Sequence, residues 1–150
     1  MYNLGQSVFF DRKELTRLRY ISYNKVKETN IKPFIVEFYE TEDGKKPVEE
    51  FLDSLNEKMA AKMVGLMELL EEKGNELRMP YSEALGDGIF ELRCKQGTDI
   101  TRALYFFYYG GKIIITNGFT QKTQKTPPNE IKIAKERRSD WIKRYKEIKG

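Results

Sequence analysis

A polar loop near the C-terminus carries the residue types best suited to bind an anion. The stretch KIIITNGFTQKTQKTPP, residues 112–128, begins as a β-rich run and is expected to break at Asn117-Gly118. The loop that follows contains no carboxylate and holds two lysines among threonines and glutamines: Lys122, Lys125, Thr120, Gln121, Thr123, Gln124 and Thr126. Donors without acids favour an anionic ligand, and the length of the loop suits a phosphate backbone.

Two arginines are expected to lie beside this loop. In the simplest hairpin register, symmetric about Gly97-Thr98, Arg93 lies directly opposite Arg102, and period-two alternation places both side chains on one face. A two-residue turn at Gly110-Gly111 then brings Phe119 next to Arg102 on that face. The predicted row, at the end of the sheet where the lysines begin, suits a phosphate clamp beside a surface for base stacking.

These residues also have an ordinary structural interpretation. The arginines can form surface ion pairs worth less than about 1 kcal/mol with nearby acids, Arg93 with Glu83, Glu91 or Asp87 and Arg102 with Asp99. The lysines can be solvated loop charges, and Phe119 can belong to the core. Like charges directly opposite one another destabilise a sheet, so the predicted pair of arginines requires a compensating group.

The composition excludes several kinds of catalytic site. The 150 residues include no histidine and one cysteine, Cys94, which rules out a Ser-His or Cys-His nucleophilic pair and argues against a structural zinc site. Catalysis must therefore use Arg, Lys, Tyr, carboxylates or groups of the substrate. The unpaired cysteine and the lack of an apolar run of about 18 residues predict a cytoplasmic protein without a membrane span.

Charge is unevenly distributed along a chain whose net charge is +4. Residues 41–92 hold 6 Lys/Arg against 13 Asp/Glu, a net charge of −7, whereas residues 112–150 hold 11 against 4, a net charge of +7. The basic C-terminal part predicts a molecule with one cationic face.

The elements that must position these residues follow from periodicity and turn residues. A strand is predicted over 34–39, and Pro47 begins a helix with apolar residues at helical spacing. A second helix is expected to be capped by Asn56 and ended by Gly74. Three strands of a meander and a last helix follow, with strands over 89–94, 101–108 and 113–115 and with Asn129 as the cap of the helix.

The predicted order β, α, α, β, β, β, α is that of an α+β domain with helices on one side of a mainly antiparallel sheet. This domain is expected to span residues 31–150. Residues 1–30 form an N-terminal extension with a weak helical stripe at Leu15, Leu18 and Ile21. Two interpretations of it stay open, a flexible basic arm and an upstream start that the cell does not use.

Several short blocks of the chain form a pattern when they are taken together. They are PVEEFLDSL at 47–55, FELR at 90–93, RALYFF at 102–107, NGF at 117–119 and KTQKTP at 122–127, followed by Glu130-Ile131 and Ala134. In order and spacing they resemble the HigB-type, phage-derived branch of the RelE toxin superfamily, over about residues 33–145. The resemblance implies the RelE-like βααβββα fold, with a helical hairpin and a C-terminal helix packed on the sheet.

The resemblance also implies a function. Members of this superfamily are toxins of type II toxin–antitoxin pairs, and this branch implies a helix-turn-helix antitoxin as the partner. The implied activity is cleavage of mRNA in the ribosomal A site, without metal or cofactor. It starts with attack of a ribose 2′-hydroxyl on the adjacent phosphate and leaves a 2′,3′-cyclic phosphate and a free 5′-hydroxyl.

Roles of single residues follow from the same resemblance. Arg93 and Arg102 match the strand arginines, which orient the phosphate and stabilise the charge on the phosphorane. Lys122 and Lys125 match the basic loop and serve as general acid or base and as phosphate contacts. Further RNA contacts are expected from Phe119, Thr123, Gln124, Arg137 and Arg138. The general base stays open among a lysine, a tyrosine and ribosomal RNA.

Two other classes of function remain as alternatives. The same superfamily includes toxins that bind gyrase and cut no RNA, and in these the arginine and lysine set is largely absent. A plain nucleic-acid-binding module would need the basic face alone. Retention of Arg93, Arg102, Lys122 and Lys125 favours the nuclease by analogy.

Overall fold

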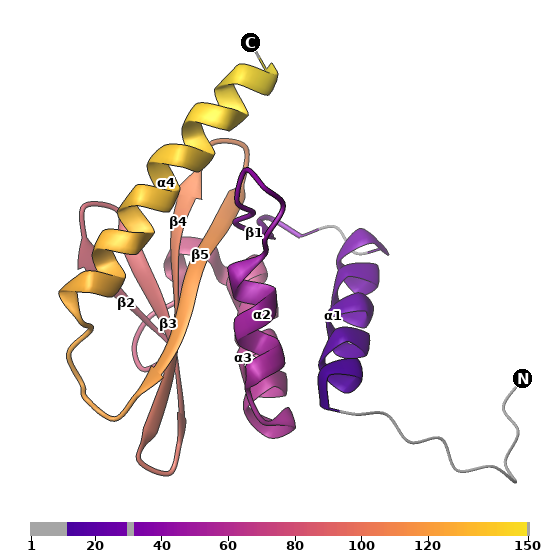
Figure 1. The fold of residues 1–150 in the computed structure, drawn as a ribbon, viewed down its shortest axis with the longest axis vertical. Helices are drawn as coiled ribbons and strands as arrows, with labels where there is room; N and C mark the ends of the chain where they lie inside the picture. Colours follow the sequence, from indigo (N-terminus) through magenta and orange to yellow (C-terminus); the bar gives the residue numbers. More distant parts are fainter. Residues whose placement is uncertain (1–11, 30–31, 150) are drawn as a thin grey trace, which may run out of the picture.

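The computed structural model describes residues 12–29 and 32–149, except for the side chains of 22–29, and shows a five-stranded sheet between helices (Figure 1). Its elements are α1 (Arg12–Thr29), β1 (Ile35–Phe38), α2 (Pro47–Ser54), α3 (Glu57–Lys73), the 3-10 turn η1 (Gly74–Glu76), β2 (Ser82–Gly86), β3 (Ile89–Gln96), β4 (Asp99–Tyr108), β5 (Lys112–Gln121) and α4 (Pro128–Lys149). The sheet order is β1-β5-β4-β3-β2, in which β1 is parallel to β5 and all other pairs are antiparallel. The predicted α+β fold is confirmed.

Helices cover both faces of the sheet, which corrects the prediction that they lie on one side. The α2–α3 hairpin packs on one face through residues such as Leu52 and Met63. On the other face, Ala134 and Trp141 of α4 pack against Leu104 and Phe106 of β4 (Figure 1). Helical spacing identifies an apolar stripe on each helix but not the face of the sheet that this stripe covers.

The helix α1 lies along the outer side of the α2–α3 hairpin (Figure 1). The predicted apolar stripe is not its packing surface, because Leu18 and Ile21 are 43% and 50% exposed. Polar contacts attach it instead, together with the ring of Tyr20, which stacks on Phe38 at a centroid distance of 5.2 Å. Arg12 donates to backbone carbonyls at the end of α2, and Arg19 Nη1 donates to the carbonyl of Glu57 at 3.1 Å.

The helical hairpin has the predicted ends. Asn56 caps α3, since its Oδ1 accepts the N–H of Met59 at 2.8 Å. Gly74 ends α3 with a φ of 55°, and a Cβ at this position would lie 2.1 Å from the ring of Phe34. Both the backbone conformation and the close ring therefore require glycine here.

The last helix begins two residues earlier than predicted. Asn129 is not its cap, because α4 begins at Pro128 and the carbonyl of Pro127 accepts the N–H of Glu130 at 3.0 Å. Proline suits the first position of a helix, where its fixed φ is already helical and its missing N–H needs no partner.

The strand register that aligns the arginines is the predicted one. Arg93 pairs with Arg102, and Arg102 pairs with Phe119. The β3–β4 connection is shorter than expected, because both strands extend to a two-residue turn at Gly97-Thr98. Turn residues mark the centre of a hairpin, and the register follows from that centre whatever the strand length.

The register of Phe119 results from two deviations that cancel. The β4–β5 turn has three residues, 109–111, where two were predicted, so Tyr108 pairs with Lys112. A bulge at Thr116 then shifts the pairing by one residue, so Tyr105 pairs with Ile115 but Leu104 pairs with Asn117. One residue added in the turn and one in the bulge bring Phe119 to the predicted partner.

Asn117-Gly118 does not break the strand, which corrects the prediction, and β5 continues to Gln121. Asn117 is buried, and its Nδ2 donates to Oε2 of Glu130 at 2.8 Å. At Gly118 a Cβ would lie 2.3 Å from the ring of Phe51. The pair that resembles a hairpin turn in the sequence thus serves tertiary packing within a strand.

The sequence prediction missed β2. The segment SEALG lacks β-branched and aromatic residues, and it forms a short edge strand that pairs with β3 only as far as Ser82 opposite Leu92. Its shortness leaves the last residues of β3 without a neighbouring strand on that side.

Candidate functional site

Residues 122–127, here called the lysine loop, connect β5 to α4 and lie beside the ends of β3 and β4. Lys122 and Lys125 are both exposed. Within the described residues, no carboxylate lies within ion-pair distance of either ammonium group. The loop therefore presents two uncompensated cations to solvent.

Arg102, a residue of β4, attaches this loop to the sheet. Its side chain is fully buried, and the guanidinium donates to the carbonyl of Thr123, to the carbonyl of Gln124 at 2.8 Å and to Oγ1 of Thr126 at 3.4 Å. Burial lowers the pKa of Arg102, while the carboxylate of Glu91 opposes that effect. The rigid fork of a guanidinium can bind several acceptors at once, so one residue fixes the conformation of the loop.

Glu91 is the group that compensates the two arginines, and it is completely buried. Its Oε2 accepts from Oγ1 of Thr126 at 2.5 Å, and its Oε1 lies 3.5 Å from Nε of Arg93. Burial raises the pKa of Glu91, against the hydrogen bond from Thr126 and the charges of Arg102 and Arg93. The carboxylate of Glu91 is therefore paired directly with Arg93 and linked to Arg102 through Thr126.

Arg93 lies at the edge of the same network. Its Nη1 donates to Oε2 of Glu83 at 2.9 Å, and its Nη2 donates to Oε1 of Gln124 at 3.0 Å. Two of the ordinary ion pairs considered for Arg93, those with Glu83 and Glu91, are thus present. The pair between Arg93 and Glu91 was considered as a surface ion pair. It is buried instead, because this part of β3 lies under the lysine loop.

Phe119 combines the two roles considered for it. It is partly buried against the apolar cluster below α4, and the guanidinium carbon of Arg102 lies 5.8 Å from its ring centroid. This distance is within the range of cation–π attraction. The ring therefore packs beside the buried arginine and keeps part of its surface exposed.

Arg137 and Arg138 lie apart from this network. Arg137 Nη1 donates to the carbonyl of Thr116 at 2.8 Å, and its guanidinium lies over the ring of Tyr39. Arg138 donates to the carbonyl of Asp87 in the β2–β3 turn. In the part of the chain described, neither arginine bonds to the lysine loop, and both attach α4 to the sheet.

The structure thus brings together seven of the nine predicted residues: Arg93, Arg102, Phe119, Lys122, Thr123, Gln124 and Lys125. The predicted site residues did not include Glu91, which was considered only as an ion-pair partner of Arg93, or Thr126, which was named only as part of the polar loop. A signal for Glu91 was present, because it stands two residues before Arg93 and must share its face of the strand. The sequence has no comparable signal for Thr126, whose contact depends on the path of the loop.

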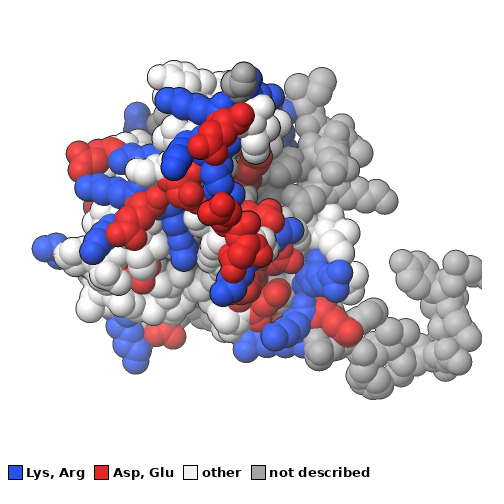
Figure 2. All heavy atoms as spheres, turned by 45° about the horizontal axis from the view of Figure 1, so that its top comes forward, with Lys and Arg blue, Asp and Glu red and all other residues white. Residues whose placement is uncertain are grey.

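Charges of both signs mix on the face toward the C-terminal end of α4 (Figure 2). That side of the molecule is not uniformly cationic. In residues 12–29 and 32–149, no helix is long and apolar enough to cross a membrane. The same residues contain no group of three or more His, Cys, Asp or Glu placed to hold a metal ion.

Comparison with known proteins adds one finding. No curated protein matches the chain. The family model described as phage derived protein Gp49-like (DUF891) matches residues 50–139, from α2 into α4, and so covers the whole network and the lysine loop. The match spans more than half of the chain, so this protein belongs to the Gp49-like family, a family of RelE-like toxin type associated with toxin–antitoxin systems, in which a cognate antitoxin is the partner.

Proposed function

We propose that this toxin belongs to the HigB-like branch and is an mRNA endoribonuclease that acts on the ribosome. The observation that carries the proposal is the lysine loop. Lys122 and Lys125 extend from it without acidic partners among the described residues, while Arg102 and Thr126 hold the loop in one conformation. A rigid site with uncompensated cations is what stabilisation of a phosphorane requires, because the donors need no reorganisation during the reaction.

The proposed reaction is an in-line transfer within the RNA. The 2′-hydroxyl gives its proton to a general base while its oxygen forms a bond to the adjacent phosphorus. The bond from phosphorus to the 5′-oxygen breaks, and that oxygen takes up a proton. Lys122 and Lys125 supply the positive charge for the phosphorane and the proton for the leaving group.

The two arginines have different roles in this proposal. Arg93 retains a side-chain exposure of 10% at the edge of the loop, so it is the strand arginine placed to contact a phosphate. Arg102 is completely buried and acts through the loop that it holds, as a positioning residue. Phe119, Thr123 and Gln124 complete the RNA-contacting surface.

The second candidate function is toxicity by binding a protein target such as gyrase, without cleavage of RNA. One observation favours it. Both arginines already have partners within the protein. Arg102 donates to the lysine loop, and Arg93 pairs with Glu83 and Glu91, as expected for a network with a purely structural role.

The test is induced expression with primer extension on a cellular mRNA. We expect the wild type to arrest growth and to produce new in-frame 5′ ends, and the double variant Lys122→Ala/Lys125→Ala to lose both. The control Lys143→Ala/Lys146→Ala removes the same charge from exposed positions of α4 and should behave as the wild type. Circular dichroism of the purified variants checks their fold. Arrest without new ends would replace the nuclease with the protein-binding toxin.

A further inference from the structure

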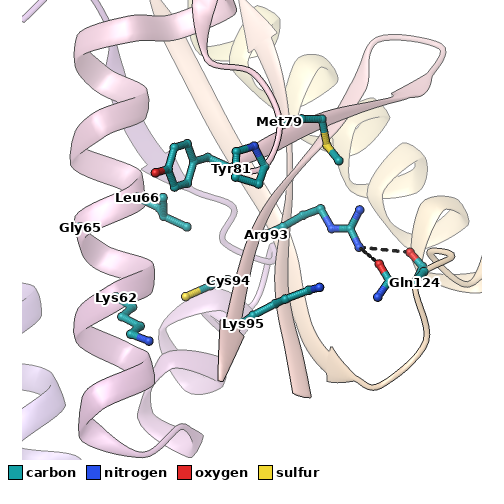
Figure 3. A pocket seen from close by; sticks show the side chains of 10 residues that line it. Lys62, Gly65, Leu66, Met79, Tyr81, Arg93, Cys94, Lys95 and Gln124 are labelled. Carbon is teal, nitrogen blue, oxygen red and sulfur yellow. Dashed lines mark hydrogen bonds between the residues drawn. The ribbon is translucent and has the colours of Figure 1, made fainter. Parts of the chain in front are cut away.

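A cavity of about 500 Å³ opens where β3 extends beyond β2. It is bounded by α3, by residues 79–81 before β2, and by residues 93–95 of β3 (Figure 3). The backbone N–H of Arg93 donates to the carbonyl of Tyr81 at 2.9 Å, and the pairing of the two segments ends there. The cavity therefore results from the difference in length between two neighbouring strands.

The walls of the cavity are apolar and partly exposed. Leu66 of α3 and Cys94 of β3 point toward each other across it (Figure 3). Met79 and Tyr81 at its mouth are 58% and 48% exposed. The hydroxyl of Tyr81 has no hydrogen-bond partner among the described residues. An exposed aromatic ring beside an apolar cavity offers a surface for a flat ligand.

The charged groups of the cavity are all cationic. Lys62, Arg93 and Lys95 line it, and no carboxylate does. Neither lysine has an acidic partner within ion-pair distance in the described part of the chain. An apolar interior with cations at its edge fits a ligand that is flat and apolar at one end and anionic at the other, which is the chemistry of a nucleotide.

The cavity is continuous with the proposed cleavage site. Arg93 and Gln124 line both, and they are joined by the bond from Nη2 to Oε1 at 3.0 Å (Figure 3). An RNA strand with one nucleotide in the cavity would therefore pass Arg93 on its way to the lysine loop. An acidic peptide could also meet these cations, but the exposed ring of Tyr81 favours a stacking ligand over an extended chain.

We propose that this cavity holds one unstacked nucleobase of the RNA, with Tyr81 as the stacking surface and Lys62 and Lys95 as contacts of the flanking phosphates. The inference rests on the proposed function and specifies how its substrate is bound. It makes the cavity a place where the toxin distinguishes bases, next to the cations that contact the RNA backbone.

Binding is measured on the purified toxin with short RNAs in which every ribose is 2′-O-methylated. These RNAs lack the nucleophile and cannot be cleaved, so binding is read separately from activity. We expect Tyr81→Leu to weaken binding roughly 5- to 100-fold, the range of one lost stacking contact, and Tyr81→Phe to bind as the wild type. The control Tyr109→Leu changes a tyrosine that is 85% exposed at the β4–β5 turn and should have no effect.

The charges are tested by reversal. Lys62→Glu and Lys95→Glu should each weaken binding and reduce the salt dependence by about 0.7 in the slope of log K against log salt, as for one lost phosphate contact on single strands. Lys58→Glu makes the same change one turn earlier on α3, outside the cavity, and should leave the slope unchanged. Thermal unfolding of each variant checks the fold.

The outcomes separate this inference from the proposed function. If the wild type cleaves RNA but neither the Tyr81 nor the lysine variants alter binding, the cavity does not hold a base, while the nuclease stands. Loss of affinity for an acidic peptide, with RNA affinity unchanged, would assign the cavity to a protein partner and also overturn the inference. If the wild type arrests growth without cleaving or binding RNA, the proposed function itself fails.

Discussion

On the sheet face that carries α4, one end is covered by aromatic side chains and the other by a polar loop. At one end, rings from β4 and α4 interlock, with Phe106, Tyr108, Trp141 and Tyr145 at centroid distances of 4.8 to 5.9 Å. At the other end, the lysine loop takes the place of the helix and covers a buried arginine and a buried glutamate.

The two ends differ in how completely the hydrogen bonds of their buried groups are satisfied. The aromatic end buries apolar area without strict geometric demands. At the polar end, Nε of Arg102 and Oε1 of Glu91 make no hydrogen bond within the described residues. Buried polar groups without hydrogen bonds reduce stability, and proteins commonly retain such groups at functional sites. Of the two ends, the polar end is therefore the one that stability alone explains less well.

The largest expected effect comes from removing the charge at the polar end. Arg102→Met removes a buried cation whose charge acts on Glu91 and frees three acceptors of the lysine loop, so the free energy of unfolding should fall by about 3 to 5 kcal/mol. Urea denaturation measures this loss. A change below about 1 kcal/mol would mean that the polar end contributes no more than a surface network. Arg93→Met is the matched comparison. It removes a partly exposed side chain and leaves the bonds of Arg102 to the lysine loop in place, so a smaller loss is expected.

A smaller effect is expected at the aromatic end. Trp141→Ala removes a partly buried ring that contacts Phe106, Tyr108 and Tyr145, and it should lower the free energy of unfolding by about 2 to 3 kcal/mol, below the range for a fully buried ring. RNA cleavage per folded molecule should stay unchanged, as measured by primer extension at matched toxin levels. A selective loss of cleavage would mean that the two ends are coupled.

The smallest effect concerns the pH dependence of the polar end. Burial raises the pKa of Glu91 in the folded state, so the folded protein binds more protons than the unfolded chain, and this contribution to stability is lost as pH rises from the ordinary glutamate pKa through the raised pKa. Glu91→Gln should therefore gain stability relative to the wild type across that window.

The measurement for Glu91 is the difference between the two unfolding free energies at a series of pH values. Asp43, Asp87 and Asp140 have lowered pKa values and give the opposite trend, but both proteins contain them, so their contributions cancel in the difference. A variant that loses stability relative to the wild type with rising pH would show that the arginine charges outweigh burial.

Local sequence patterns predicted the helical hairpin, its caps and the row of Arg93, Arg102 and Phe119. The reason is that hairpin register depends on the turn centre, which glycine-containing pairs reveal. The same reasoning placed a two-residue turn at Gly110-Gly111 and a break at Asn117-Gly118, and both were wrong. The register of Phe119 was nevertheless correct, because the longer turn and the bulge at Thr116 compensate each other.

The sequence by itself determined which residues share a face, because alternation along a strand and spacing along a helix are properties of the local backbone. It also determined the charges and the chemistry that histidine-free catalysis must use. Only the tertiary structure decided that Arg102 is buried, that Glu91 is buried and paired with Arg93, and that the lysine loop covers them. These facts depend on the path of a loop between β5 and α4, and the packing of distant elements sets that path.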